Sequence, residues 1–387
     1  MSLSFSSLIN EWCQMRQFQR LNSVNRNIVF YAEDESSYSH FESIIDSLLK
    51  VYAGPICYLT SMPCDKIFKL KNERIQTFYI GKGMVRTILF KILKAGIMIM
   101  TMPDLGTYHI KRSIYSVHYL YVNHSMVSMH MIYRKGAFDH FDTVFCVGPH
   151  HMSEIREMEK VYGLPEKILF KHGYGKLDSL IRNQEKRQKL SSRNARKKVL
   201  IAPSWGPHGL LETCGEKLVE ILLGAGYLVT VRPHPQTKRN TPDVLNSLQA
   251  RFSNEPNFSY EENIASAESF YESDIMISDW SGAALEYSFG LGGPVLFIDV
   301  PRKVNNSEYD KISHEPIEVF IRPELGAVVP LDQLHNAPEF IEELCSNKSE
   351  RLEKTRRASK QWVFNVGCSG EKGAAYITQL ISEMESV

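Results

Sequence analysis

The chain has 387 residues, of which 43% are hydrophobic and 23% charged, and its formal net charge is +1. This length exceeds what a single hydrophobic core usually fills, so we expect two domains. The composition excludes a disordered chain, and the near-zero net charge provides no global attraction to nucleic acid. The seven cysteines are odd in number and form no Cys-x-x-Cys pair. This pattern argues against a disulfide framework or a zinc site and fits a reducing compartment.

The N-terminal sequence lacks the basic start and apolar core of a signal peptide. The longest apolar run lies around residues 97–102, far short of the roughly 20 residues that a membrane-spanning helix needs. We therefore expect a cytoplasmic protein. Peripheral attachment to the inner face of the membrane stays open at this point.

Short apolar runs alternate with helical patterns in the first half of the chain. Alternation at this rhythm predicts a parallel sheet with helices on both faces. The expected strands are 27–32, 56–60, 75–80, 96–102, 118–123 and 143–147, and the expected helices are 37–50 and 151–162.

A basic segment then separates the two halves. Residues 182–198 hold eight Lys or Arg and one Glu, a local charge of +7. One interpretation is a solvated helix and interdomain linker, and the other is a basic strip for an anionic acceptor or anionic lipid head groups. We place an N-terminal domain at 1–180, the linker at 181–198 and a C-terminal domain at 199–387.

A second strand–helix series follows the basic segment. A charged helix at 350–362, for which Ser349 is a plausible N-cap, and a last helix at 374–385 close the chain. The last helix could pack back on the first domain. The expected strands are 199–202, 227–231, 258–260, 275–278 and 295–298, and the expected helices are 212–224, 241–252, 265–272 and 282–290.

Ligands of open α/β sheets bind beyond the carboxyl ends of the strands. The strand ending at Val231 is followed by Arg232, Pro233, His234 and Pro235. Two prolines stiffen this turn, so Arg232 and His234 would be presented on a rigid backbone suited to a diphosphate. The alternative is that His234 only caps a turn.

The strand at 275–278 leads through a short polar turn into a helix. Backbone N–H groups and the helix dipole at such a point favour phosphate. Ser278, Asp279, Ser281 and Gly282 are the candidates for phosphate, and Glu286 for ribose hydroxyls. The alternative is an ordinary N-cap by Ser281 or Asp279, with Glu286 a plain exposed helix residue.

Two further positions follow strands. After 199–202, a loop rich in Gly and Pro carries Ser204, His208 and Gly209, which would line a donor or acceptor pocket unless the loop is a plain surface turn. His124 ends the strand at 118–123 and is a candidate general base, or one of 13 histidines with a structural role.

Other signatures are missing. The sequence contains no phosphate-loop motif, no Gly-x-Ser-x-Gly and no His-Glu-x-x-His. Gly81-Lys82-Gly83 lacks a third glycine, and His150-His151 has no carboxylate cluster at useful spacing. We therefore predict no metal and no cofactor.

The order and spacing of several motifs resemble the CDP-glycerol glycerophosphotransferase family, which includes teichoic-acid and capsule polymerases. The resemblance is stronger in the second half than in the first. The second half carries Pro203-Ser204-Trp205, Arg232-Pro233-His234-Pro235 and Ser278-Asp279-Trp280-Ser281, and the first half carries Asn123-His124-Ser125, Phe141-Asp142-Thr143-Val144-Phe145 and Gly173-Tyr174-Gly175-Lys176-Leu177-Asp178.

The resemblance implies a GT-B fold, with two facing Rossmann-like domains and the nucleotide held mainly by the second. It implies transfer of a polyol phosphate from a CDP-alcohol to a hydroxyl of a cell-surface polysaccharide or lipid-linked acceptor, with release of CMP. His124 would then be the general base, and His234 would stabilise the diphosphate together with Ser281 and the helix after it.

Three departures from the family pattern leave the donor open. The family usually has a second serine where this chain has Gly282, an aspartate near Glu286, and Trp-His-Gly where this chain has Asn123-His124-Ser125. One rival function is a GT-B glycosyltransferase that uses a CMP- or UDP-activated sugar, or the related nucleotide-sugar epimerase. Another is a non-catalytic polysaccharide-binding or export protein.

Overall fold

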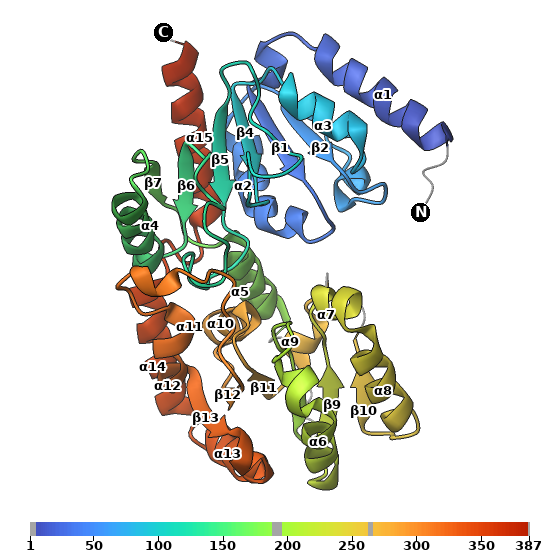
Figure 1. Cartoon of the computed structure of the whole chain (residues 1–387), viewed down its shortest axis with the longest axis vertical. Coiled ribbons are helices and arrows are strands. Elements are labelled where there is room, and N and C mark those ends of the chain that lie inside the picture. The colour runs from blue at the N-terminus through green and yellow to red at the C-terminus, as the bar shows by residue number, and fades with distance from the viewer. Residues whose placement is uncertain (1–4, 188–195, 262–265, 386–387) are drawn as a thin grey trace. The chain divides into compact units, whose positions relative to one another are not determined.

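The computed structural model describes residues 5–187, 196–261 and 266–385 (Figure 1). The chain forms two compact units, each with its own parallel sheet. Neither unit is continuous in sequence, because the chain crosses between them four times. Unit 1 consists of Met1–His124, Arg134–Asp178 and Val363–Val387, and unit 2 of Ser125–Tyr133 and Ser179–Trp362.

The sheet of unit 1 has seven strands in the order β3-β2-β1-β4-β5-β6-β7, all parallel. Its central strands are buried on both faces, which explains why they read as continuous apolar runs. The strand order reverses between β1 and β4. The strands are β1 (Ile28–Ala32), β2 (Ile56–Thr60), β3 (Ile75–Tyr79), β4 (Ile97–Met100), β5 (His118–Val122), β6 (Thr143–Cys146) and β7 (Ile168–Lys171).

Helices cover both faces of this sheet. Helices α2 and α15 pack against each other and bury Phe41, Ile44 and Ile377 on one face (Figure 1). Helices α1 and α3 contact each other, and Phe90 of α3 packs edge-on against Tyr31 of β1. The helices are α1 (Phe5–Arg20), α2 (Ser37–Val51), α3 (Met84–Lys91), α4 (Pro149–Tyr162), α5 (Gly175–Arg187), which continues into unit 2, and α15 (Ser369–Glu385), with 3₁₀ turns η1 (Val24–Arg26) and η2 (Lys66–Lys69).

A neutral histidine is built into the core of unit 1. The His172 ring stacks on Phe145 with centroids 4.5 Å apart, and Gly373 leaves it room, since a Cβ there would lie 2.8 Å from Nε2. Nδ1 lies 3.1 Å from the Gly173 carbonyl oxygen, so this nitrogen carries the proton. Burial lowers the pKa of His172 to about 4.

Acid is therefore expected to destabilise unit 1. Below about pH 6.5, His172 becomes protonated in the unfolded state but stays neutral in the folded state. The free energy of unfolding therefore falls as the pH is lowered from about 6.5 to about 4. The shift corresponds to roughly 3 kcal/mol. Buried His40 acts in the same direction, since burial lowers its pKa as well. Urea unfolding at pH 7.5, 6 and 5 should show a smaller acid-dependent loss in His172→Phe. An equal loss in both proteins would contradict this.

The sheet of unit 2 has six strands in the order β10-β9-β8-β11-β12-β13, again all parallel. Its order reverses between β8 and β11. The two sheets confirm the predicted α/β class with parallel strands. The strands are β8 (Lys198–Ile201), β9 (Leu228–Val231), β10 (Phe258–Tyr260), β11 (Ile275–Ser278), β12 (Val295–Asp299) and β13 (Gly326–Pro330).

One face of this sheet is covered by α6, α8 and α13, which bury Leu218, Leu248 and Ile341 against it. Helices α9 and α10 contact each other and strands β8 and β11. The helices are α6 (Leu210–Gly224), α7 (Pro235–Asn240), α8 (Pro242–Phe252), α9 (Glu268–Glu272), α10 (Gly282–Leu291), α11 (Ile317–Phe320), α12 (Arg322–Leu325), α13 (Ala337–Ser346) and α14 (Lys348–Trp362), with 3₁₀ turns η3 (Tyr309–Lys311) and η4 (Leu331–Asn336).

The described parts of the predicted basic segment, residues 182–187 and 196–198, belong to unit 2, and residues 188–195 fall outside the described residues. Four described basic residues have partners within unit 2, which reduces the charge open to a separate anionic surface. The pairs are Arg187 with Glu268, Arg196 with Asn257, Lys197 with Glu342 and Lys198 with Glu272. Across the described ranges, no helix combines the length and the hydrophobicity that crossing a membrane requires.

Candidate functional site

The reversal of strand order in unit 2 brings the ends of β8 and β11 together, and Asp279 joins them. One carboxylate oxygen accepts a hydrogen bond from Ser204 N at 2.6 Å and the other from Leu210 N at 3.0 Å. The Ser278 hydroxyl donates to the Ala202 carbonyl at 2.8 Å. Asp279 and Ser278 are buried. These two predicted site residues thus fix the loop 203–209 and the first turn of α6.

The N-terminus of α10 follows directly. Ser281 is its N-cap, and the Ser281 hydroxyl accepts a hydrogen bond from Ala283 N at 3.2 Å. This agrees with the N-cap interpretation for Ser281, while Asp279 caps no residue of α10 in the structure. Gly282 and Ala283 are half-buried, and Glu286 is buried one turn further on. The first turn of α10 therefore offers N–H groups and the positive end of a helix dipole at the sheet edge.

His234 is held in one tautomer by its own turn. It is the N-cap of α7, and its Nδ1 accepts a hydrogen bond from Gln236 N at 3.1 Å. A nitrogen that accepts an N–H carries no proton, so the neutral ring bears its proton on Nε2. His234 therefore presents a hydrogen-bond donor, the group that a phosphate oxygen requires. The capping interpretation is also correct, and the two roles use different nitrogens.

Arg232, the partner predicted for His234, is engaged inside unit 2. Its Nη1 donates to the Ser266 carbonyl at 2.7 Å and to the Glu261 carboxylate at 3.1 Å. The guanidinium also lies over the Phe270 ring, 4.9 Å from the centroid. These contacts connect β9 to α9 and position the turn that carries His234.

The loop 203–209 brings an aromatic ring to the same edge. Ser204 is buried, His208 is exposed, and Gly209 is the N-cap of α6. The ring centroid of Trp205 lies 6.1 Å from that of His234. Lys303 Nζ lies 4.0 Å from the same Trp205 centroid. Sequence reasoning missed Lys303, because nothing in its local sequence connects it to Trp205.

In unit 1, His124 follows β5 at the carboxyl edge of the sheet. Its Nδ1 lies 2.9 Å from the Thr101 carbonyl oxygen, just after β4, and 3.0 Å from the Tyr121 hydroxyl. A carbonyl only accepts, so Nδ1 carries the proton, and Nε2 holds the lone pair. His124 and His234 are thus held in opposite tautomers, with the first suited to accept a proton and the second to donate a hydrogen bond.

The segment 173–178, singled out by its motif, supports His124. The Tyr174 hydroxyl donates to the His124 carbonyl at 2.9 Å. Asp178 accepts hydrogen bonds from Gly367 N at 2.7 Å and Ser369 N at 2.8 Å, which fixes the start of α15. The His40 ring lies edge-on to His124 with centroids 6.2 Å apart. Because burial lowers the pKa of His40, this neighbour is neutral near pH 7 and adds no positive charge beside His124.

Ser125 and Gly282, two positions at which this chain departs from the family pattern, lie side by side. The chain passes from unit 1 to unit 2 between His124 and Ser125. Within unit 2, a Cβ on Gly282 would lie 2.5 Å from the Ser125 hydroxyl oxygen. Glycine at 282 is therefore what allows serine at 125. The hydroxyl beside the first turn of α10 comes from Ser125 and needs no side chain at position 282.

A methyl group at position 282 would force the Ser125 hydroxyl to move. Overpacking costs up to about 1–3 kcal/mol where a neighbour cannot move, and less where a side-chain end can rotate away. Gly282→Ala should therefore lower the urea midpoint of unit 2, and adding Ser125→Gly should restore most of the loss. Gly224→Ala is the matched control, because a Cβ there meets nothing within 4 Å. Additive effects of the two changes would show that Ser125 and Gly282 are not coupled.

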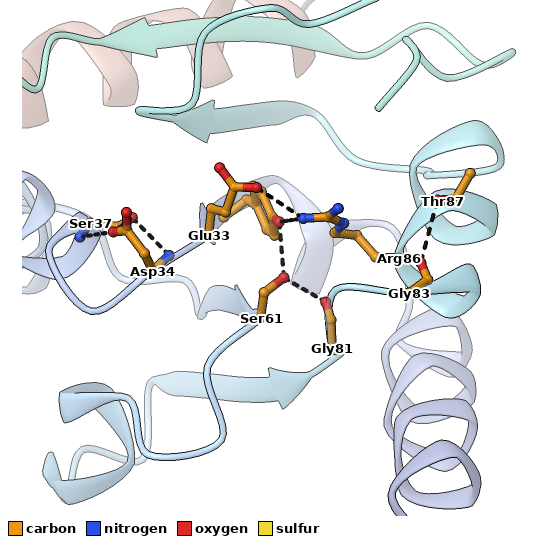
Figure 2. Close-up of polar contacts among 9 residues, drawn as sticks. Glu33, Asp34, Ser37, Ser61, Gly81, Gly83, Arg86 and Thr87 are labelled. Carbon is orange, nitrogen blue, oxygen red and sulfur yellow. Dashed lines mark hydrogen bonds and ion pairs between the residues drawn. The ribbon is translucent and has the colours of Figure 1, made fainter. Parts of the chain in front are cut away.

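A second polar group lies at the carboxyl ends of β1, β2 and β3 in unit 1 (Figure 2). Arg86 of α3 donates from Nη1 to the Glu33 carboxylate at 3.1 Å and to the Tyr31 hydroxyl at 3.0 Å. Ser61 lies 2.9 Å from that hydroxyl and donates to the Gly81 carbonyl at 2.6 Å. Arg86 is buried and Glu33 is partly exposed, so the cluster presents a carboxylate, suited to accept hydrogen bonds from hydroxyls.

In the described parts of the chain, no group of three His, Cys, Asp or Glu side chains is placed to hold a metal ion. His150 and His151 lie in the first turn of α4, which begins at Pro149, two residues before the predicted start, and their ring centroids are 4.1 Å apart.

A family of known proteins matches more than half of this chain. Residues 121–366, nearly two thirds of the chain, match the family model of CDP-glycerol:poly(glycerophosphate) glycerophosphotransferase. The search of curated protein sequences found no match.

Solved structures agree in fold. The wall teichoic acid polymerase TagF, in a histidine-to-asparagine variant soaked with CDPG, is 15% identical to this chain, with a TM-score of 0.63. The match covers 97% of this chain and 94% of the TagF chain. The UDP-GlcNAc 2-epimerase of Methanocaldococcus jannaschii, in complex with UDP-GlcNAc and UDP, is 15% identical (TM-score 0.57; 91% and 99% covered). The Neisseria meningitidis enzyme, bound to UDP-GlcNAc, is 12% identical (TM-score 0.58; 92% and 100%). These likenesses confirm the GT-B-like fold.

Proposed function

The chain belongs to the CDP-glycerol:poly(glycerophosphate) glycerophosphotransferase family, and from this premise we propose that it transfers glycerol phosphate, or a related polyol phosphate, from a CDP-alcohol to a hydroxyl group. The acceptor in this proposal is a cell-surface polysaccharide or a lipid-linked precursor of one, and the product that leaves is CMP. The observation that carries the proposal is the pair of histidines at strand ends, held in opposite tautomers by His124 Nδ1–Thr101 O and Gln236 N–His234 Nδ1.

Unit 2 binds the donor in this proposal. The first turn of α10, capped by Ser281, and the Nε2 proton of His234 provide donors for the two phosphates. Asp279 holds the turn before α10 through its bonds to Ser204 N and Leu210 N, and Arg232 holds the turn before His234 through the Ser266 carbonyl. Little reorganisation is therefore needed when charge develops on the leaving group. Glu286 is the proposed contact of the ribose hydroxyls.

His124 is the proposed general base. The acceptor oxygen attacks the phosphorus that carries the polyol, and the bond from that phosphorus to the CMP oxygen breaks. The acceptor proton passes to Nε2 of His124, and CMP leaves with the bonding electrons. His124 precedes Ser125 by one residue, and Ser125 lies against Gly282 at the start of α10. Phosphoryl transfer depends mainly on positioning and charge stabilisation, which fits a site of this simple composition.

Unit 1 is the proposed acceptor domain. The Glu33 carboxylate, paired with Arg86, suits a polyol or sugar hydroxyl. For a lipid-linked acceptor, the basic segment 182–198 is a proposed point of peripheral contact with anionic membrane lipids. Sedimentation with anionic and neutral vesicles would distinguish contact with lipid from a plain linker.

The proposal is tested by CMP release from a panel of donors. Purified protein is offered CDP-glycerol, CDP-ribitol, CMP-sugars and UDP-sugars, with and without EDTA, together with a polysaccharide or lipid acceptor fraction. We expect CMP from a CDP-alcohol only, with incorporation of the polyol phosphate into the acceptor. CMP or UDP released only from activated sugars would replace the proposal by glycosyl transfer. Binding of polysaccharide without turnover of any donor would favour the non-catalytic function.

A further inference from the structure

The loop that follows β12 is hydrogen-bonded to residues 130–132, a segment from the first half of the sequence. Asn306 Nδ2 donates to the His130 carbonyl at 2.9 Å, and Asn305 Nδ2 donates to the Ile132 carbonyl at 2.7 Å. Asn305 N adds a bond to the Met131 carbonyl at 3.0 Å, and Asn306 is buried. All of these residues belong to unit 2. The backbone just after Lys303 is therefore fixed by the fold.

Lys303 has a charge that no ion pair neutralises. Its Nζ lies 4.0 Å from the centroid of the Trp205 ring, and none of the described acidic side chains is within ion-pair distance of it. The acidic groups that act on Lys303 are Asp279, which accepts from Ser204 and Leu210, and Glu212, of which one oxygen accepts from Thr241. The other oxygen of Glu212 is buried without a hydrogen-bond partner. Burial lowers the pKa of Lys303 to about 8, although Asp279 and Glu212 partly oppose the shift.

A partly desolvated ammonium without a counter-ion is unfavourable, and a bound anion that pairs with it would remove this cost. Trp205, which lies under Lys303, also contacts His234, with ring centroids 6.1 Å apart. The indole therefore has an ammonium near it and an imidazole whose proton lies on Nε2. Each of these groups suits a phosphate oxygen better than an apolar group.

We infer that Lys303 binds a phosphate oxygen of the diphosphate of a nucleotide held beside Trp205 and His234. The inference deepens the proposed function, since the CDP-alcohol is the diphosphate in question, but the oxyanion site itself would serve any nucleoside diphosphate. Lys303 is then a binding residue that sequence reasoning did not find.

The inference has a pH signature. A bound diphosphate stabilises the charged ammonium, so protein with neutral Lys303 must take up a proton to bind. Affinity should therefore fall as the pH rises through about 8. The charged groups that act on Lys303 are Asp279 in the turn before α10 and Glu212 on α6. His234 lies beside the same Trp205 ring, and Arg302 precedes Lys303 in the sequence and lies over Trp280. The variants below separate Lys303 from these groups.

The experiment measures the affinity of the full chain for inorganic pyrophosphate, CDP and UDP by calorimetry at pH 7.0, 8.0 and 9.5. Lys303→Met should weaken CDP binding about tenfold or more at pH 7.0 (about 1.4 kcal/mol) and remove the pH dependence. Lys303→Arg should keep the affinity, and its pH dependence should be flat because guanidinium stays charged. Lys311→Met is the matched control, since exposed Lys311 pairs with Glu308 in the same stretch of chain.

The outcomes separate this inference from the proposed function. Wild-type affinity and pH dependence in Lys303→Met, with a normal melting temperature, would overturn the inference, as would a wild-type protein that binds none of the three ligands. Lys303-dependent binding of pyrophosphate and UDP, without turnover of any CDP-alcohol, would uphold the inference and refute the proposed donor. If Lys303→Met melts early, Lys303→Arg decides, because loss of its affinity or a persisting fall with pH counts against the inference.

Discussion

Replacing His124 by glutamine is expected to slow CMP release about 10²- to 10⁴-fold, the usual contribution of a general base. The loss should appear in kcat, because the residue acts on the acceptor proton and the donor is proposed to bind through unit 2. Nδ1 of His124 donates to the Thr101 carbonyl at 2.9 Å, which leaves Nε2 as the basic atom. Glutamine offers an amide in its place, and an amide oxygen is too weak a base to take the proton.

The readouts are kcat, KM and the affinity for CDP, with CDP affinity expected to change by less than about threefold, under 1 kcal/mol. The pH profile adds a test that a structural role would not pass, since the acid limb of wild-type activity should disappear in His124→Gln. His118→Gln is the matched control on the same strand, where Nε2 of His118 lies 2.8 Å from the Thr143 hydroxyl at the other end of β5. Equal losses in both variants, or a loss of CDP affinity alone, would remove His124 from the chemistry.

The parallel sheets could be predicted because their strands are buried on both faces. Runs such as residues 28–32 and 275–278 contain no exposed position, so each appears in the sequence as an uninterrupted apolar run. Two strands, β7 and β13, were missed. Strand β7 (Ile168–Lys171) has exposed or half-buried side chains along its length, and β13 (Gly326–Pro330) begins with glycine and ends with proline. Periodicity carries no signal in either case.

The candidate site was predictable only where a strand leads directly into a polar turn. His124, His234 and Ser281 satisfy this rule, and the structure places all three at carboxyl ends of strands. Lys303 does not stand out, since a lysine in a polar loop is ordinary and its partner Trp205 is distant in sequence. The crossing of the chain at Ser125 is likewise invisible in sequence, because it depends on contacts such as Ser128 with Glu318.

Asp279 illustrates a different limit of sequence reasoning. A conspicuous acidic residue between a strand and a helix suggests contact with ligand, yet both of its oxygens accept backbone N–H groups of the loop at 203–209 and of α6. Backbone donors leave no trace in a sequence. The same holds for Arg232, whose guanidinium binds the Ser266 carbonyl and lies over Phe270.

The second large effect is expected at His234. His234→Asn should lower kcat/KM for the CDP-alcohol by about 10²- to 10³-fold, the loss typical of one preorganised donor to a developing oxyanion. Asparagine is the informative replacement, because its side-chain oxygen can still accept the Gln236 N–H that Nδ1 accepts now, at 3.1 Å. Asparagine is also among the best N-caps, so α7 keeps its start while the donor at Nε2 is lost.

His234→Ala removes the cap and the donor together, so comparison of the two variants separates the two roles. If the donor acts on the diphosphate, both variants lose affinity for CDP and pyrophosphate to a similar degree. Only His234→Ala also loses stability, with a free energy of unfolding lower by about 1 kcal/mol. If His234 is merely a cap, His234→Asn is fully active and His234→Ala is not. His335→Asn, at an exposed histidine of the same unit, controls for the substitution itself. Full activity of His234→Asn would leave the diphosphate to Lys303 and the first turn of α10 alone.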